Sequence, residues 1–121
     1  PIPSENTFTP LSARSDMVPS RSSPKFSPSE ISYCESGKNR FERYAARFAA
    51  KEAFAKALGI GIWGGIPMNA ISVIHGENQR PEIKIDPAFE SQISDLIGTK
   101  IHLSLSHTTT KAIAFVVLDS K

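Results

Sequence analysis

The sequence predicts an α+β domain in which an antiparallel sheet packs against one long helix. Three features carry this prediction: a stretch with helical spacing before residue 59, an alternating apolar pattern at 100–106 and a continuously apolar run at 112–118. Helices and strands in this order are typical of an α+β fold. With 121 residues and 40% hydrophobic side chains, the chain can bury one modest core, so we expect a single domain.

Residues 1–25 are predicted to form an extended or disordered arm in front of a domain at 26–121. The arm holds five of the nine prolines and six serines, and it has no glycine and no apolar periodicity. Such a composition cannot bury enough apolar surface to offset the entropy cost of ordering the chain.

A short helix is expected from Ser27 to about Ser36. Ser27 can cap its first turn and Pro28 suits the first helical position, while Glu30 stands where a capping box needs an acidic side chain. Gly37 is expected to end this helix.

A longer second helix is expected to run through Leu58. Asn39 and Glu42 repeat the capping-box spacing at its start, and Gly59 follows its last apolar residue.

The middle of the chain predicts a hairpin and a third helix. The segments AISVIH (70–75) and PEIKI (81–85) flank five turn-forming residues at 76–80. Asp86 and Pro87 then favour a helix start, and Gly98 a helix end. The apolar positions at helical spacing in between are Phe89, Ile93, Leu96 and Ile97.

Two strands complete the predicted fold. In KIHLSLS (100–106) apolar and polar residues alternate, which is typical of a half-buried strand. The run AIAFVVL (112–118) is apolar throughout, so we expect a central strand that is covered on both faces.

Positive charge is concentrated on the long helix. The whole chain has a net charge of +2, whereas residues 38–56 carry six basic side chains against two carboxylates. At 100° per residue, four of the basic side chains form one stripe, which we call the basic ridge. Such a ridge indicates an anionic partner. The basic ridge consists of Arg40, Arg43, Arg47 and Lys51.

Glu52 and Lys56 lie away from the basic ridge, among small apolar residues of the same helix. One interpretation is an exposed i,i+4 ion pair, which contributes about 0.3–0.5 kcal/mol. The other is a partly buried site, where the carboxylate binds a hard cation such as Mg²⁺ and the ammonium meets a phosphate group. Both interpretations are open at this level.

Composition argues against several other classes of protein. No apolar run approaches the length that crosses a bilayer, so we expect no membrane role. The single cysteine, Cys34, cannot form an internal disulfide and no secretory pattern precedes it, which favours a cytoplasmic protein. The basic ridge could bind nucleic acid, but Tyr44 and Phe48, the nearby stacking residues, fall on the apolar side of the helix. We therefore expect no nucleic-acid partner.

Four collinear segments resemble the holo-(acyl-carrier-protein) synthase family, the small bacterial 4′-phosphopantetheinyl transferases. The most specific are RFAAKEAFAKALG (47–59) and LSLSH (103–107). FSPSE (26–30) resembles the segment that opens the first helix of that family, and AIAFVV (112–117) resembles its closing strand. The resemblance implies a 4′-phosphopantetheinyl transferase-like fold.

The resemblance also implies an activity. Members of the family transfer the phosphopantetheine arm of coenzyme A to a serine of apo acyl carrier protein, with Mg²⁺, in fatty acid biosynthesis. Glu52 would be the metal ligand and, with Lys56, a catalytic residue. Lys56 would meet the pyrophosphate, and Arg47 and His107 would hold coenzyme A phosphates. From the sequence alone, His107 could equally be a turn histidine bonded to backbone. The resemblance further implies acyl carrier protein as partner and a homotrimer.

One departure from the family supports an alternative. The family opens with a strand whose aspartate, in a Gly-x-Asp-x-Val-type motif, supplies a second metal ligand, and Asp16-Met17-Val18 is the nearest match here. A chain without that aspartate could be a non-catalytic domain that binds coenzyme A or a carrier protein.

Overall fold

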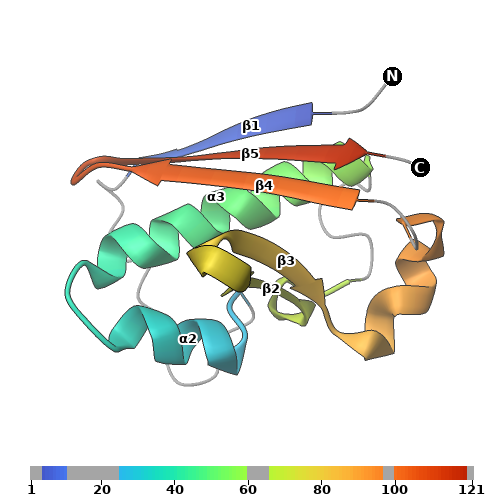
Figure 1. Cartoon of the computed structure of the whole chain (residues 1–121), viewed down its shortest axis with the longest axis horizontal. Helices are drawn as coiled ribbons and strands as arrows, with labels where there is room; N and C mark the ends of the chain where they lie inside the picture. Colours follow the sequence, from blue (N-terminus) through green and yellow to red (C-terminus); the bar gives the residue numbers. More distant parts are fainter. Residues whose placement is uncertain (1–3, 11–24, 60–65, 97–99, 120–121) are drawn as a thin grey trace.

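The computed structural model describes residues 4–10, 25–59, 66–96 and 100–119, with two sheets and one long helix between them. In Figure 1 a three-stranded sheet lies above helix α3 (Arg40–Leu58), and helix α2 (Pro28–Glu35) lies below it together with a two-stranded hairpin. The predicted α+β fold, with an antiparallel sheet packed against a long helix, is therefore confirmed. No helix in these ranges is long and apolar enough to cross a membrane.

The larger sheet has the strand order β1-β5-β4 and is antiparallel throughout. Strand β5 (Lys111–Asp119) is central, as predicted, with β1 (Ser4–Pro10) on one side and β4 (Lys100–His107) on the other. His107 stands opposite Ala112 in the register, so the end of β4 lies beside the start of β5.

Strand β1 lies within the segment that was predicted to be an extended or disordered arm. Residues Ser4–Pro10 pair along their whole length with β5, from Ser4 opposite Val117 to Pro10 opposite Lys111. An edge strand tolerates proline at its end, because one side of its backbone needs no partner. The remaining residues of the arm before Lys25, apart from this strand, lie outside the described ranges.

The hairpin is confirmed as a separate two-stranded sheet. Strand β2 (Ile71–His75) pairs with β3 (Pro81–Ile85), and a short 3-10 turn, η3 (Glu77–Gln79), joins them. A second 3-10 turn, η2 (Met68–Ala70), leads into β2.

Helix α2 begins with the predicted capping box. The backbone N–H of Glu30 donates to Oγ of Ser27 at 3.4 Å, and the N–H of Ser27 donates to Oε1 of Glu30 at 2.9 Å. The two side chains thereby satisfy backbone donors that have no partner within the helix.

Helix α3 ends as predicted but begins differently. Gly59 closes it in the left-handed conformation, with φ of 71°. Asn39 also has a positive φ of 62° and makes no side-chain cap, so the predicted capping box with Glu42 is wrong. Glu42 instead contacts His107, whose Nδ1 lies 2.8 Å from its Oε1. A long-range partner has replaced the local one.

The third predicted helix is a 3-10 helix, η4 (Pro87–Leu96). Its start is tight, because the N–H of Phe89 donates to the carbonyl of Asp86, and Oδ1 of Asp86 accepts from the N–H of Ala88. Ile97 and Gly98 lie outside the described ranges.

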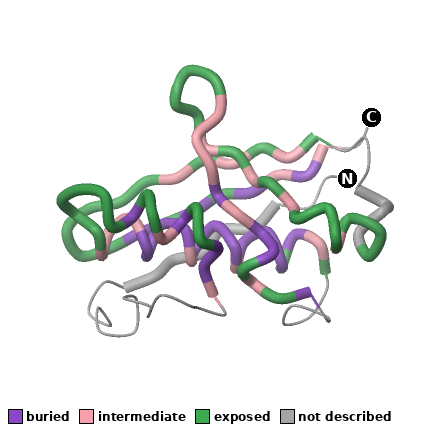
Figure 2. Tube along the Cα trace, turned by 90° about the horizontal axis from the view of Figure 1, so that it is seen from below, coloured by how far each residue is buried: buried purple, intermediate pink, exposed green. Residues whose placement is uncertain are grey.

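The core lies between α3 and β5, where Figure 2 shows the buried trace. Small side chains of the helix meet branched side chains of the strand, since Ala49, Ala50 and Ala53 pack in one cluster with Val116 and Leu118. Alanine lets the helix approach the sheet closely.

The outer face of β5 overturns one prediction. Ile113 and Phe115 are 44% and 41% exposed, so the strand is not covered on both faces. The buried residues of β5 alternate with the exposed ones, because α3 covers one face of the sheet. By contrast, β4 shows the predicted half-buried pattern.

Candidate functional site: a basic pocket and an acid–lysine pair on one helix

Helix α3 carries the predicted site residues on two opposite sides. Arg47 is 3% exposed and faces the layer formed by α2 and the hairpin. Lys56 is exposed, and Glu52 is partly exposed. Lys56 follows Arg47 by nine positions, which at about 100° per residue is about two and a half helical turns. The two side chains therefore leave the helix on opposite sides. The structure thus brings Glu52 near Lys56, and Arg47 near His107, but it separates the two pairs.

Arg47 and His107 line a pocket of about 340 Å³ between α2, α3, the hairpin and the end of β4, which we call the basic pocket. Two arginines and two histidines line it, and its described lining residues include no carboxylate, although the Glu42 carboxylate contacts His107. The complete lining is Tyr33, Asn39, Arg43, Ala46, Arg47, His75, Pro81, Leu105 and His107.

The ring of Tyr33 organises the positive charge of the basic pocket. The guanidinium carbons of Arg43 and Arg47 lie 4.5 and 4.3 Å from its centroid. The ring of His75 lies 4.7 Å from the same centroid. A cation near the face of an aromatic ring is attracted by its quadrupole, so Tyr33 helps hold two like charges close together.

Arg47 has an unused hydrogen-bond donor. Its Nε is buried without a hydrogen-bond partner among the described residues, and its Nη1 makes only a long bond of 3.4 Å to the carbonyl of Arg43. A buried donor without an acceptor is unusual and costly. A phosphate oxygen is the acceptor that suits a guanidinium.

The histidines of the basic pocket differ in their surroundings. Burial lowers the pKa of His75, and the charges of Arg47 and Arg43 lower it further. His107 is exposed and pairs with Glu42, so the alternative of a turn histidine bonded to backbone does not describe it. An anion in the pocket would favour the protonated form of His75.

On the other side of α3, no hydrogen bond or ion pair links the side chain of Glu52 or Lys56 to another described residue. The structure therefore does not contain the simple i,i+4 ion pair. The described residues also hold no cluster of three or more metal-ligating side chains. One carboxylate is nevertheless a suitable donor for Mg²⁺, which commonly binds through one or two carboxylates, waters and substrate phosphates.

Only part of the basic ridge is exposed to solvent. Arg40 is exposed and Arg43 is partly exposed, whereas Arg47 and Lys51 are buried under α2 and the hairpin. Lys51 is fully buried in an ion pair with Glu30. The prediction of one continuous positive face is wrong because a basic stripe on a helical wheel does not reveal a buried acid elsewhere in the chain.

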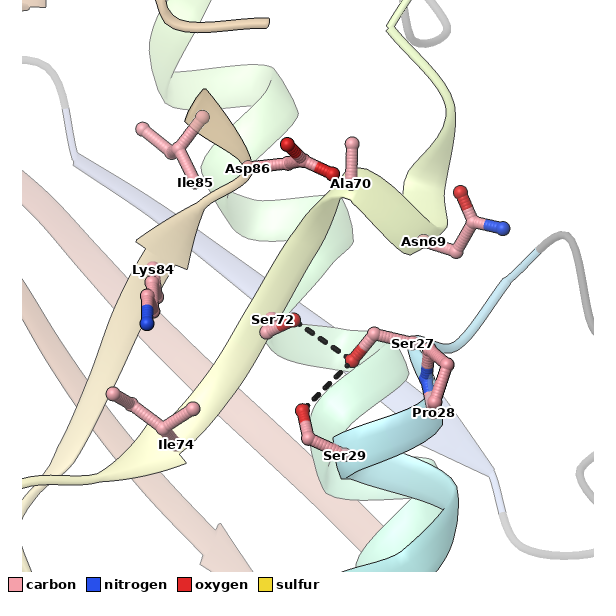
Figure 3. Close-up of a pocket in the computed structure, with 10 residues that line it drawn as sticks. All are labelled: Ser27, Pro28, Ser29, Asn69, Ala70, Ser72, Ile74, Lys84, Ile85 and Asp86. Carbon is pink, nitrogen blue, oxygen red and sulfur yellow. Dashed lines mark hydrogen bonds between the residues drawn. The ribbon is translucent and has the colours of Figure 1, made fainter. Parts of the chain in front are cut away.

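A second hollow of about 330 Å³ lies at the opposite end of α2, between the helix start and the hairpin. Figure 3 shows its chain of hydroxyl groups. Oγ of Ser72 donates to Oγ of Ser27 at 2.8 Å, and Oγ of Ser27 lies 3.2 Å from Oγ of Ser29. Lys84 and Asp86 line the hairpin side. These hydroxyls already bond to one another and tie α2 to β2.

Sequence reasoning missed three members of the basic pocket. Arg43 was recognised only as part of the basic ridge, although its position one turn before Arg47 places both on the same helix side. Tyr33 and His75 come from other elements, and no local pattern links them to Arg47. Only the packing of α2 and the hairpin against α3 brings them together.

These features define a small α+β protein whose central helix carries the basic pocket on one side and the Glu52 and Lys56 side chains on the other. Comparison with known families agrees with this class: residues 11–116 match the sequence model of the 4′-phosphopantetheinyl transferase superfamily. The chain belongs to this enzyme superfamily.

Individual relatives narrow the position within the superfamily. The chain is 46% identical over 96 residues to the holo-(acyl-carrier-protein) synthase of Cytophaga hutchinsonii, covering 78% of this chain and 76% of that protein. It is 42% identical over 94 residues to the synthase of Koribacter versatilis, with 78% and 75% covered. The resemblance to the holo-(acyl-carrier-protein) synthase family is confirmed.

Solved structures give the same result for the fold. The synthase of Neisseria meningitidis superimposes with a TM-score of 0.81 at 27% identity, covering 98% of this chain and 97% of that one. The synthase of Bacillus anthracis, in complex with coenzyme A (3′,5′-ADP), gives a TM-score of 0.76 at 27% identity, with 99% and 96% covered. The predicted 4′-phosphopantetheinyl transferase-like fold is therefore confirmed.

Proposed function

We propose that this chain transfers the 4′-phosphopantetheine group of coenzyme A to a serine of apo acyl carrier protein. Phosphopantetheinyl transfer is the reaction of its superfamily, and its relatives at 42–46% identity are named for the acyl-carrier-protein substrate. The observation that carries the proposal is the buried Nε of Arg47 in the basic pocket, which has no hydrogen-bond partner in the described part of the chain.

Coenzyme A is the proposed co-substrate, and the basic pocket is its proposed phosphate site. Arg47 and His107 would bind phosphate oxygens, and Arg43 would add a second guanidinium. Tyr33 holds both arginines in place. The solved relative from Bacillus anthracis contains coenzyme A (3′,5′-ADP), which supports the same ligand class here.

The reaction requires a displacement at phosphorus. The serine hydroxyl of the carrier protein attacks the phosphorus that bears the pantetheine arm, the bond from that phosphorus to the bridging oxygen breaks, and adenosine 3′,5′-bisphosphate leaves. Lys56 would meet the pyrophosphate and stabilise the charge that develops on its oxygens. The serine proton passes to a base during attack. Because such catalysis depends mainly on positioning and charge neutralisation, the chain needs few reactive groups.

Mg²⁺ is the proposed metal, with Glu52 as its protein ligand. When bound, such an ion neutralises pyrophosphate charge and makes the phosphorus easier to attack. The partly exposed Glu52 carboxylate, which no described cation engages, fits this role.

Acyl carrier protein is the proposed partner, and a cytoplasmic role in fatty acid biosynthesis is proposed with it. The exposed part of the basic ridge around Arg40, together with Lys38, would attract an acidic carrier protein.

A homotrimer is proposed, with coenzyme A bound between neighbouring copies. Arg47 and Lys56 lie on opposite sides of the helix, so a site between copies could use Arg47 of one copy and Lys56 of the next. The exposed Ile113 and Phe115 supply an apolar surface for contact between copies.

The deciding experiment is a transfer assay by mass spectrometry. The protein is incubated with coenzyme A, MgCl₂ and apo acyl carrier protein, with and without EDTA. A phosphopantetheine mass gain on the carrier protein that EDTA abolishes is the expected result. No mass gain at any enzyme concentration, in a preparation that still binds coenzyme A, would replace the transferase with a coenzyme A-binding domain.

A further inference from the structure

The buried ion pair between Glu30 and Lys51 connects α2, α3, η2 and β2. Nζ of Lys51 donates to Oε1 of Glu30 at 2.5 Å, and both side chains are fully buried. The same ammonium donates to the carbonyls of Lys25 at 2.6 Å and Met68 at 3.1 Å. Each of its three hydrogens therefore has an acceptor on a different segment of the chain.

The carboxylate of Glu30 is equally well satisfied. Its Oε1 also accepts from the N–H of Ser27 at 2.9 Å, and its Oε2 accepts from the N–H of Val73 at 2.9 Å. Through Ser27 the network reaches the hydroxyl chain of the hollow in Figure 3. The pair is thus the junction at which the start of α2 and the middle of β2 are joined to α3.

Stability is a weak reason for such a pair. Burial lowers the pKa of Lys51, and the Glu30 carboxylate opposes that shift. Removing two charges from water is costly, and a buried ion pair replaced by apolar side chains of similar volume often leaves a protein equally stable. An ammonium with three fixed acceptors holds the helix in one rotation about its axis. An apolar side chain in the same place would not fix that rotation.

The position of Lys51 on α3 connects the rotation of the helix to the proposed functional residues. Lys51 directly precedes Glu52 and follows Arg47 by one helical turn. A helix that is fixed with Lys51 inward turns Glu52 about 100° away from it, toward the open side, and keeps Arg47 on the inward side. One buried anchor therefore sets the rotation of both proposed functional groups.

We propose that the Glu30–Lys51 ion pair is a positioning device that fixes the rotation of α3, so that Arg47 stays in the basic pocket while Glu52 faces outward. This inference rests on the proposed function and adds two positioning residues to it. Neither residue touches the substrate, so their effect passes through the orientation of the helix.

The test separates position from stability by removing one charge and then both. Glu30→Gln leaves the Lys51 ammonium buried without a carboxylate, and the melting temperature should fall. In the double variant Glu30→Gln/Lys51→Met neither of these two charges remains, so the melting temperature should return toward that of the parent chain. Transfer should not return with it: we expect kcat to stay lower by about 10-fold or more, with weaker coenzyme A binding by calorimetry in the absence of metal.

A double variant that recovers both the parental melting temperature and the parental kcat would overturn the positioning role. Glu30→Asp decides the matter if the double variant does not fold. It keeps the charge but shortens the side chain by one methylene, so kcat should fall while folding persists, and Glu35→Asp, on the exposed side of α2, is its matched control. A parental kcat in folded Glu30→Asp would also overturn the proposal.

The parent chain is assayed first. This assay distinguishes a failure of the proposed function from a failure of the positioning role. A parent that binds coenzyme A but does not transfer its arm would disprove the proposed function. The coenzyme A affinities of the same variants would still test the positioning role through Arg47, since equal affinities in parent and double variant would contradict it.

Discussion

Arg47 and Lys56 leave helix α3 on opposite sides, one buried in the basic pocket and the other exposed. A helix with its side chains is about 10–12 Å across, so the two positive groups of one copy face different surroundings. We therefore expect a coenzyme A that contacts both groups to lie between two copies of the chain.

Mixing two inactive variants tests this arrangement. Glu52→Gln disables the outward side of α3, and His107→Ala disables the basic pocket. Co-expressed in equal amounts, the two variants should regain about a quarter of the parental transfer rate. Of the contacts between copies, one half have an intact outward side and one half an intact pocket, so about a quarter of the contacts have both. Transfer by the purified mixture is measured against each variant alone.

The matched control for this mixture combines two changes on the same side. Glu52→Gln mixed with Lys56→Ala should regain no activity, because every contact then lacks one member of the pair. Recovery in this control, or no recovery in the first mixture when light scattering shows trimers, would contradict a site between subunits.

The Glu52 carboxylate should matter for chemistry more than for folding. Glu52 is partly exposed and bonds to no other described side chain, so Glu52→Gln should change the unfolding free energy by less than about 0.5 kcal/mol. Its transfer rate should fall by about 100-fold, with a higher Mg²⁺ requirement. Kinetics over a MgCl₂ series check this, and Glu90→Gln on η4 is the control because Glu90 is also an exposed acid. A parental rate for Glu52→Gln would remove Glu52 from the metal site.

The basic pocket should make stability depend on pH through His75. Its pKa lies below the ordinary value of 6.5 because of burial and the charges of Arg47 and Arg43, beside the neutral ring of Tyr33. The folded state therefore binds fewer protons than the unfolded state below about pH 6.5, so stability is lost as pH falls from there toward the folded pKa. Thermal unfolding from pH 7.5 to 5 should show a smaller loss for His75→Gln than for the parent.

Coenzyme A should reverse part of that pH dependence. A bound phosphate favours the protonated imidazole, so the affinity of the parent should rise as pH falls through the same range. His102→Gln, on the exposed face of β4, should behave like the parent in both measurements. An unchanged pH slope in His75→Gln would show that another group titrates.

The contact between α3 and β5 should not tolerate added volume. Ala53 is fully buried in the cluster that contains Val116, so Ala53→Leu should destabilise the protein by about 1–3 kcal/mol through overpacking. Denaturant unfolding measures the loss. The same change at the exposed Ala88 should be within about 0.5 kcal/mol of the parent. Equal stabilities for the two variants would contradict close packing at this contact.

Local chemistry was a good guide wherever the partner of a residue lay within a few positions. The Ser27–Glu30 capping box and the Gly59 helix end were predictable because one turn of backbone decides them. The strands were equally accessible, since alternation along 100–107 reports directly on the two faces of β4.

Predictions failed where a distant partner decided the outcome. Glu42 had the spacing of a capping residue but pairs with His107, 65 positions away. Lys51 had the helical position of a ridge residue but is buried against Glu30. Local spacing cannot reveal that a better partner arrives from another element.

The prediction that β5 is covered on both faces failed for a different reason. An apolar run predicts burial, and Ile113 and Phe115 are apolar, but among the described residues only the opposite face of β5 packs against α3. The pattern is the one expected if the second cover is another copy, which the sequence of one chain does not display.

The alanines that line the buried side of α3 have one more consequence. An alanine side chain has no rotamers to exchange, so the helix side of this contact has little freedom to adjust. A protein built in this way cannot absorb an altered neighbour by reshuffling side chains. A change at this contact would therefore shift Arg47 and Glu52 together, because both lie on α3.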